Sequence, residues 1–204
     1  MTPALTSIPN RIIIATALLL QTAFCHGQSS APVREFYDTA FKWHITIPNG
    51  LEPIPDTTWA RMQNRGAAAI ESTLNEKVEN HSKTIFVLMS DQFNYFESNY
   101  QPFDRAEHSN YLEACKEVDD VIYSTFKAQI PKAPIDTSFT TEVIGGLEFQ
   151  VFNMGIHMNE QATLHLFMYS RVFGKKEFSV NIMYVDPEKG RPLMTAWKAS
   201  SFGK

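Results

Sequence analysis

The stretch TLHLFMYSRVFGKKEFSVNIMYV, residues 163–185, decides the fold class of this chain. In its second half, Phe178, Val180 and Ile182 alternate with polar residues, which is the pattern of a β-strand with one buried face. The first half, residues 163–173, is apolar on both faces and predicts the central strand of a sheet. Only Gly-Lys-Lys separates the two strands, so they must pair antiparallel.

Further strands are predicted upstream of this hairpin. Residues 138–144 and 147–158 are extended stretches joined by Gly-Gly, and they complete a four-stranded antiparallel meander. Residues 84–90 are apolar on both faces, which indicates a strand covered on two sides. Residues 41–47 alternate aromatic or aliphatic with polar side chains, which predicts a half-buried opening strand.

Three helices are predicted from apolar spacing and end signals. The first covers residues 57–76 behind Asp56 as N-cap, and its run RGAAAIE predicts close approach to a sheet. The second covers residues 105–129, because Asp104 and Glu107 form a capping-box pattern. The third covers residues 188–200.

The second helix is the clearest of the three. We expect its buried stripe to be Tyr111, Cys115, Val118, Ile122 and Phe126. Its opposite side carries charges that predict a solvated face, namely Glu113, Lys116, Glu117, Asp120 and Lys127. Nothing in the pattern removes these carboxylates from water, as acid–base catalysis would require.

This order of elements resembles the PsbP and Mog1 family, which includes exported bacterial members of unknown function. The resemblance is carried by the turn Ile47-Pro48-Asn49-Gly50, by Tyr184-Val185-Asp186 before the last helix, and by Ser201-Phe202 near the end. It implies an α/β/α sandwich, in which an antiparallel sheet is flanked by helices on both faces. It also implies a noncatalytic role in binding, because known members bind a photosynthetic complex or a small GTPase. These motifs are packing features, so no functional residue is transferred.

The first 27 residues have the parts of a secretory signal peptide. Arg11 supplies the basic flank, and residues 12–20 supply an apolar run that is too short to span a bilayer, which takes about 20 residues. Cleavage after Gly27 follows the small-x-small rule and gives a mature chain that begins at Gln28. We therefore expect an exported protein, periplasmic or extracellular.

Cys25 leaves an alternative open, since a lipoprotein would be anchored through such a cysteine. The preceding Phe24 is bulky where the processing peptidase needs a small residue, which favours cleavage after Gly27 over lipidation. After the leader, residues 28–35 predict a flexible lead-in, and residues 36–204 a single domain.

The composition excludes several classes of function. The net charge is −4, and there is no cluster of lysine and arginine, so neither nucleic acid nor an anionic membrane surface is an expected partner. A nucleotide loop, a zinc-binding helix motif and a nucleophile elbow are all missing from the sequence. We therefore predict a noncatalytic binding or accessory protein of the bacterial cell envelope, without a cofactor, that binds a protein partner.

Two alternatives involve small ligands. His157 and His165 would face each other across a hairpin with Glu160 in its turn, and these are residue types that zinc accepts, although ordinary strand-end histidines explain them as well. The aromatic stretch 93–103 and the methionine-rich strands could line an apolar pocket of a ligand carrier or an unrecognised enzyme. Core packing, with Phe93 and Tyr95 opposite Phe96, is the simpler interpretation of that stretch. A cavity with convergent polar groups would favour the ligand carrier.

Overall fold

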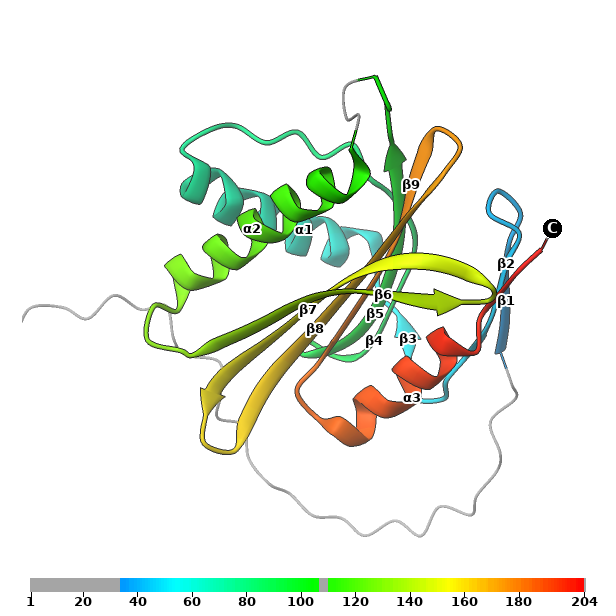
Figure 1. Ribbon diagram of the computed structural model, residues 1–204. Coiled ribbons are helices and arrows are strands. Elements are labelled where there is room, and N and C mark those ends of the chain that lie inside the picture. The colour runs from blue at the N-terminus through cyan, green and yellow to red at the C-terminus, as the bar shows by residue number, and fades with distance from the viewer. Residues whose placement is uncertain (1–33, 107–109, 204) are drawn as a thin grey trace, which may run out of the picture. The chain divides into compact units, whose positions relative to one another are not determined.

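The structure, a computed structural model, describes residues 34–106 and 110–203 (Figure 1). The predicted leader, Cys25 included, lies outside the described residues, as does most of the expected lead-in. Arg34 and Glu35, which the sequence placed in the lead-in, belong to the first strand, β1 (Arg34–Asp38). Their pairing with Ile47 and Thr46 explains this difference, because a pairing partner cannot be read from a short polar stretch.

The main layer is a seven-stranded antiparallel sheet in the order β3-β4-β5-β9-β8-β7-β6. Its strands are β3 (Glu52–Pro53), β4 (Lys83–Asp91), β5 (Asn94–Pro102), β6 (Ile135–Ile144), β7 (Leu147–Asn159), β8 (Ala162–Phe173) and β9 (Lys176–Tyr184). The predicted meander is confirmed, since β6 to β9 pair with their neighbours in sequence. The middle strand is β9 rather than the predicted β8, because β5 pairs along the other edge of β9.

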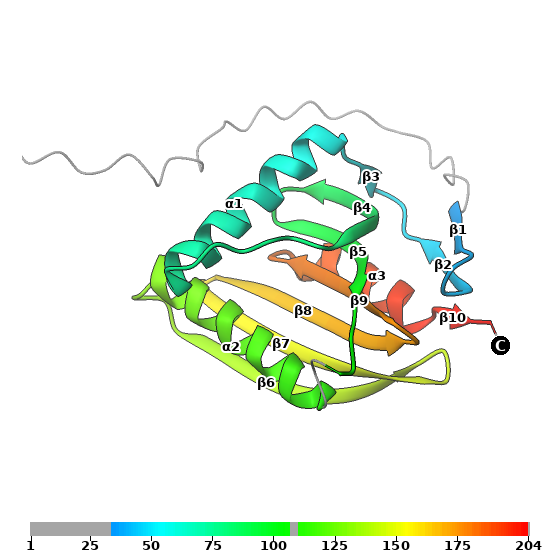
Figure 2. The ribbon, with the colours of Figure 1, turned by 90° about the horizontal axis from the view of Figure 1, so that it is seen from above.

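The two faces of this sheet are covered by different layers (Figures 1 and 2). Helices α1 (Asp56–Leu74) and α2 (Tyr111–Gln129) lie on one face. Helix α3 (Pro187–Lys198) lies on the other, together with a small sheet of β1, β2 (Trp43–Ile47) and β10 (Ser201–Phe202). The predicted α/β/α sandwich is confirmed, and the small sheet is an addition to it.

The larger hydrophobic core lies on the α3 face of the sheet. Trp43 of the small sheet and Trp197 of α3 are fully buried, and both lie against Phe178 of β9. Helix α3 approaches the sheet closely at Gly190, where a Cβ atom would lie 2.3 Å from the ring of Tyr184. The apolar side chains of the predicted β9 alternation, Phe178, Val180 and Ile182, all belong to this core.

A second, smaller core lies beneath α2 on the opposite face. It contains Met154 and Ile156 of β7 and Leu166 of β8, with Ile122 and Phe126 of α2 packed against them. This core occupies only one end of the face. The other end is polar and forms the candidate site described below.

Helix α2 begins later than predicted. Asn110 is its N-cap, and the Asn110 side chain accepts a hydrogen bond from the backbone N–H of Leu112 at 3.2 Å. The carboxylate of Asp104 accepts from the N–H of Ala106 at 2.8 Å, so it stabilises a turn rather than the start of a helix. The predicted capping box was therefore wrong at Asp104, and Glu107 lies outside the described residues.

The buried stripe of α2 also differs from the prediction at one position. Cys115 is buried, and Ile122 and Phe126 join the second core, as expected. Val118, however, is 49% exposed, whereas the next residue, Asp119, is only 8% exposed. A helix rotates by 100° per residue, so a small rotation of α2 about its axis exchanges these two neighbours.

The aromatic stretch after β4 is divided among three environments. Phe93 lies in the turn between β4 and β5 and is 41% exposed, so it is not an inner-strand residue as predicted. Phe96 is fully buried in the larger core. Tyr95 packs edge to face with Trp59 of α1.

Candidate functional site

A row of polar side chains crosses six strands on the sheet face beneath α1 and α2. The pairing register aligns Thr84, Asn99, Ser179, Ser170, Gln150 and Thr141, on β4, β5, β9, β8, β7 and β6 respectively. A sheet face covered by helices is normally apolar, because polar groups lose their hydrogen bonds to water there. A continuous polar row in this position therefore indicates a binding surface rather than a core.

Above this row, α1, α2, the segment 78–82 and the sheet border a half-open cavity of about 450 Å³, named the helix–sheet cavity below. Gly66, Ala67 and Ile70 of α1 line one wall, and Val118 and Asp119 of α2 line another. No α1 residue is fully buried, and a Cβ atom at Gly66 would meet nothing within 4 Å. The predicted close approach of the RGAAAIE run to the sheet was therefore wrong, since these small residues leave space instead.

Glu97 of β5 lies in the floor of the cavity and is 6% exposed. One of its carboxylate oxygens accepts from the side-chain amide of Asn99 at 2.7 Å, and the other accepts from that of Asn181 at 2.8 Å. Burial raises the pKa of Glu97, although the two amide donors oppose the rise. A carboxylate is thus held in a fixed orientation inside the molecule.

Among the residues that the structure describes, two buried oxygen atoms on side chains of the cavity lining have no hydrogen-bond partner. They are Oδ2 of Asp119 and Oδ1 of Asn181. Burial raises the pKa of the Asp119 carboxyl to about 7, with a further contribution from the charge of Asp120. A buried acceptor without a donor costs free energy, so both atoms indicate that a donor belongs in this space.

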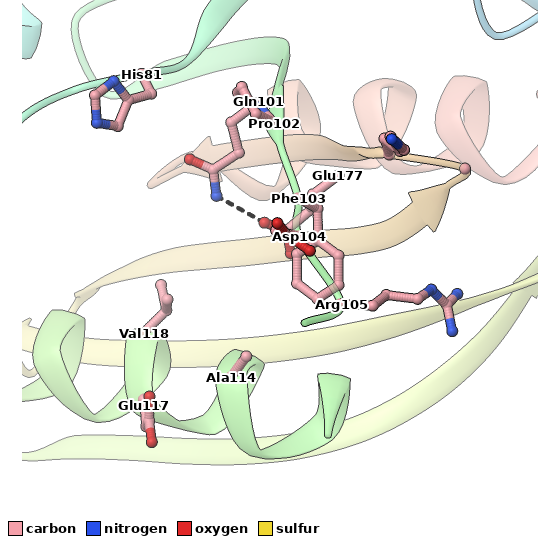
Figure 3. Close-up of a pocket in the computed structure, with 12 residues that line it drawn as sticks. His81, Gln101, Pro102, Phe103, Asp104, Arg105, Ala114, Glu117, Val118 and Glu177 are labelled. Atoms are coloured by element: carbon pink, nitrogen blue, oxygen red, sulfur yellow. Dashed lines mark hydrogen bonds between the residues drawn. The ribbon is translucent and has the colours of Figure 1, made fainter. Parts of the chain in front are cut away.

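Glu177 of β9 lies toward the other end of the polar face. One Glu177 oxygen accepts from the Tyr111 hydroxyl at 3.0 Å. The other accepts from the Gln101 amide at 2.7 Å (Figure 3). The hydroxyl of Tyr111 also lies 2.9 Å from that of Ser170, which in turn lies 3.6 Å from the sulfur of Cys115. Burial raises the pKa of the Cys115 thiol, so the thiol stays protonated at neutral pH.

An outer cleft of about 680 Å³ adjoins the helix–sheet cavity at the N-terminal end of α2 (Figure 3). Gln101, Val118 and Glu177 line both spaces. The exposure of Val118 follows from this position, since its side chain lies between the two hollows. The cleft therefore gives access to the cavity from solvent.

The histidines considered as metal ligands lie on the other face of the sheet. His157 is opposite Thr163, so His165 is its diagonal neighbour, and both ring nitrogens of His157 have partners, at 2.7 Å to Asp136 and 3.1 Å to Thr163. Within residues 34–106 and 110–203, no three histidine, cysteine or acidic side chains are grouped to hold a metal ion. Glu113 and Glu117 lie on the exposed side of α2, as expected.

The sequence interpretation missed the residues that define the cavity. Glu97 was passed over inside an aromatic stretch, and Asp119 was assigned neither to the buried stripe nor to the charged face of its helix. A signal was present in β9, where Glu177, Ser179 and Asn181 alternate with the core residues. That alternation was assigned to a solvent-facing side, because the position of α1 and α2 over it follows from tertiary packing.

The space at Gly66 leads to a stability prediction. Replacing Gly66 with alanine should stabilise the protein by about 0.5 to 1 kcal/mol, because alanine has the higher helix propensity and the added methyl group meets no atom. Urea denaturation measures this change. A loss of stability would mean that α1 packs against the sheet at this position and that the cavity is narrower than described.

The arrangement of layers defines an α/β/α sandwich of the PsbP type. The chain is similar to the solution structure of cyanobacterial PsbP (CyanoP) from Synechocystis sp. PCC 6803, with a TM-score of 0.53 and 8% sequence identity. The match covers 89% of this chain and 98% of that one. No protein-family model and no curated protein sequence matches the chain. At this identity the likeness shows the fold alone, and it confirms the PsbP-like fold expected from the sequence.

The helices of the structure also bear on membrane insertion. In the described part of the chain, no helix has the length and apolar character needed to cross a membrane.

Proposed function

We propose that this protein is a noncatalytic binding protein of the bacterial cell envelope, and that it takes up a small ligand in the helix–sheet cavity. The observation that carries the proposal is the pair of unpartnered buried oxygens, on Asp119 and Asn181, beside the row of polar side chains that crosses six strands of the sheet. A ligand with hydrogen-bond donors satisfies both atoms. The export expected from residues 1–27 supplies the envelope location.

The chemistry of the cavity supports binding over catalysis. The Cys115 thiol, which lines the cavity, and the Tyr111 hydroxyl one helical turn before it both have a pKa raised by burial, so neither is ionised at neutral pH. The carboxylate of Glu97 is fixed by two amide donors, which orients it but leaves it a weak base toward a substrate. Rigidly placed acceptors of this kind suit recognition.

The proposal is tested by filling the cavity. Ala67 of α1 lines it, whereas the next residue, Ala68, is exposed and turned away by 100° around the helix. The exported protein and its Ala67→Phe and Ala68→Phe variants are incubated with small-molecule extract of the host, and retained compounds are identified by native mass spectrometry. We expect the same compound on the wild type and on Ala68→Phe, and its loss from Ala67→Phe. Equal retention by both variants, or no retained compound, would contradict the proposal.

A second candidate function rests on the edge strand β6. This strand is ten residues long, and Phe139 and Val143 are 44% and 68% exposed. Long edge strands with exposed apolar side chains pair readily with other chains, so β6 could present an accessory protein to a protein partner. A Val143→Lys variant should then lose a protein captured from the envelope while keeping the small ligand.

A further inference from the structure

Several hydrogen-bond donors in and beside the cavity are engaged with carboxylates. The side-chain amides of Asn99 and Asn181 donate to Glu97, and those of Gln101, with the hydroxyl of Tyr111, donate to Glu177. Among the described residues, two buried acceptors of the lining residues, Oδ2 of Asp119 and Oδ1 of Asn181, have no donor. A ligand that carries hydrogen-bond donors satisfies these two atoms.

The charges of the lining further restrict the ligand. Glu79, Glu97, Asp119 and Glu177 all line the cavity, and among the described residues that line it none is a lysine or an arginine. His81 also lines it and lies 3.5 Å from the Glu79 carboxylate. A buried carboxylate is costly unless it is paired with an opposite charge, and the raised pKa of Glu97 and of Asp119 reports that cost. A cationic ligand removes it, whereas a neutral ligand leaves it in place.

The spacing of the carboxylates distinguishes a metal ion from an extended ligand. Glu97 pairs with Asn181, and Glu177 lies four residues before Asn181 on the same strand. At about 3.3 Å per residue, Glu97 and Glu177 are roughly 13 Å apart along the strand direction, which is too far for one ion. Between them the cavity also has apolar walls, formed by Ile70 of α1 and Ile122 of α2, which suit methylene groups.

We infer that the ligand is a linear polyamine, whose protonated amino groups are bound by the carboxylates of Glu97, Asp119 and Glu177. This inference rests on the proposed function and specifies its ligand class. The amino groups donate to the unpartnered oxygens and neutralise the carboxylates, while the alkyl chain contacts the apolar walls.

The inference is tested by calorimetry with defined probes. Spermidine and 1,8-octanediol, a neutral chain with hydroxyl ends, are titrated into the exported protein and into Asp119→Asn, Glu177→Gln and Asp120→Asn. Asp120 is the matched control, because it is exposed and its loss removes the same charge. We expect spermidine to bind and the diol to fail, with a loss of affinity of roughly tenfold or more for the Asp119 and Glu177 variants and little change for Asp120→Asn.

Each other outcome has a definite meaning. Equal weakening by Asp119→Asn and Asp120→Asn would show that spermidine is attracted by net charge alone, and this overturns the inference. Binding of the diol, or of a sugar, that is lost in Asp119→Asn would also overturn it while leaving the proposed cavity function intact. If spermidine does not bind while a neutral compound from host extract is retained, the polyamine inference is overturned and the proposed cavity function stands. Thermal melting of each variant confirms that lost binding does not reflect unfolding.

Discussion

Replacement of Trp197 by alanine should cost about 3 to 5 kcal/mol of stability, the range for removing a fully buried large aromatic side chain. Trp197 joins α3 to both sheets, since its ring lies 6.0 Å from Trp43, 5.2 Å from Phe149 and 6.3 Å from Phe202 between centroids. Its loss therefore leaves a cavity bordered by three separate elements that cannot all collapse into it.

The matched control is Trp59→Ala on α1. Trp59 is only partly buried and lines the helix–sheet cavity, and its indole N–H donates to the Thr84 hydroxyl at 3.0 Å. Its removal should cost about 1 to 2 kcal/mol, roughly one hydrogen bond and a partial contact. Urea denaturation with an unchanged m-value measures both. Equal losses would mean that the α1 face is packed as tightly as the α3 face, which contradicts the presence of a cavity.

The second large effect is a gain in stability. In Asp119→Asn the protein should be more stable by about 2 kcal/mol at pH 8, because the buried carboxyl, with a pKa of about 7, must otherwise ionise in the folded state. In the unfolded chain the same carboxyl has a pKa of about 3.9. Between these two values the folded protein holds more protons than the unfolded one, so its stability falls as the pH rises from 4 to 7.

The Asp119 variant has no carboxyl at this position, and the corresponding fall should disappear. The charged groups that act on this carboxyl are Lys116 and Asp120 on its own helix and Glu177 on the sheet. They remain in the variant, as does Glu97, whose raised pKa contributes a slope of the same sign. Unfolding by urea at pH 5, 6, 7 and 8 measures the difference. Asp120→Asn, which removes an exposed pair with Lys116, should change stability by less than about 1 kcal/mol at every pH.

A gain in stability combined with a loss of binding would identify Asp119 as a residue kept for function. Groups that recognise a ligand are commonly costly in the empty protein, and their replacement commonly stabilises the fold. If Asp119→Asn were instead destabilising at pH 8, the carboxylate would have a partner in the folded protein, and the unpartnered oxygen would no longer support a ligand.

Local sequence pattern predicted most of the fold. The strands of the meander were predicted because the turns between them consist of glycine or polar residues. In β9, apolar and polar side chains also alternate, which indicates a strand with one buried face. The start of α2 was misplaced because Asp104 and Asn110 are both good capping residues, and only the chain path after β5 decides between them. The start of α2 is therefore decided by tertiary contacts and not by local sequence preference.

The candidate site was far less predictable. Asp119 and Val118 are neighbours in a helix whose rotation is set by packing against β7 and β8, so periodicity alone assigned the wrong one to the interior. The polar row depends on the register of five strand pairs, which brings Asn99, Ser179 and Gln150 into line from distant parts of the chain. A pattern read along one strand cannot show that a row continues across its neighbours.

A crystal structure of the protein grown with spermidine tests the central claim most directly. The account predicts a single spermidine inside the helix–sheet cavity, with one amino nitrogen within hydrogen-bond distance of Oδ2 of Asp119 and another within that distance of the Glu177 carboxylate. Spermidine found only on the outer surface, with the oxygens of Asp119 and Asn181 bound by water alone, would contradict it.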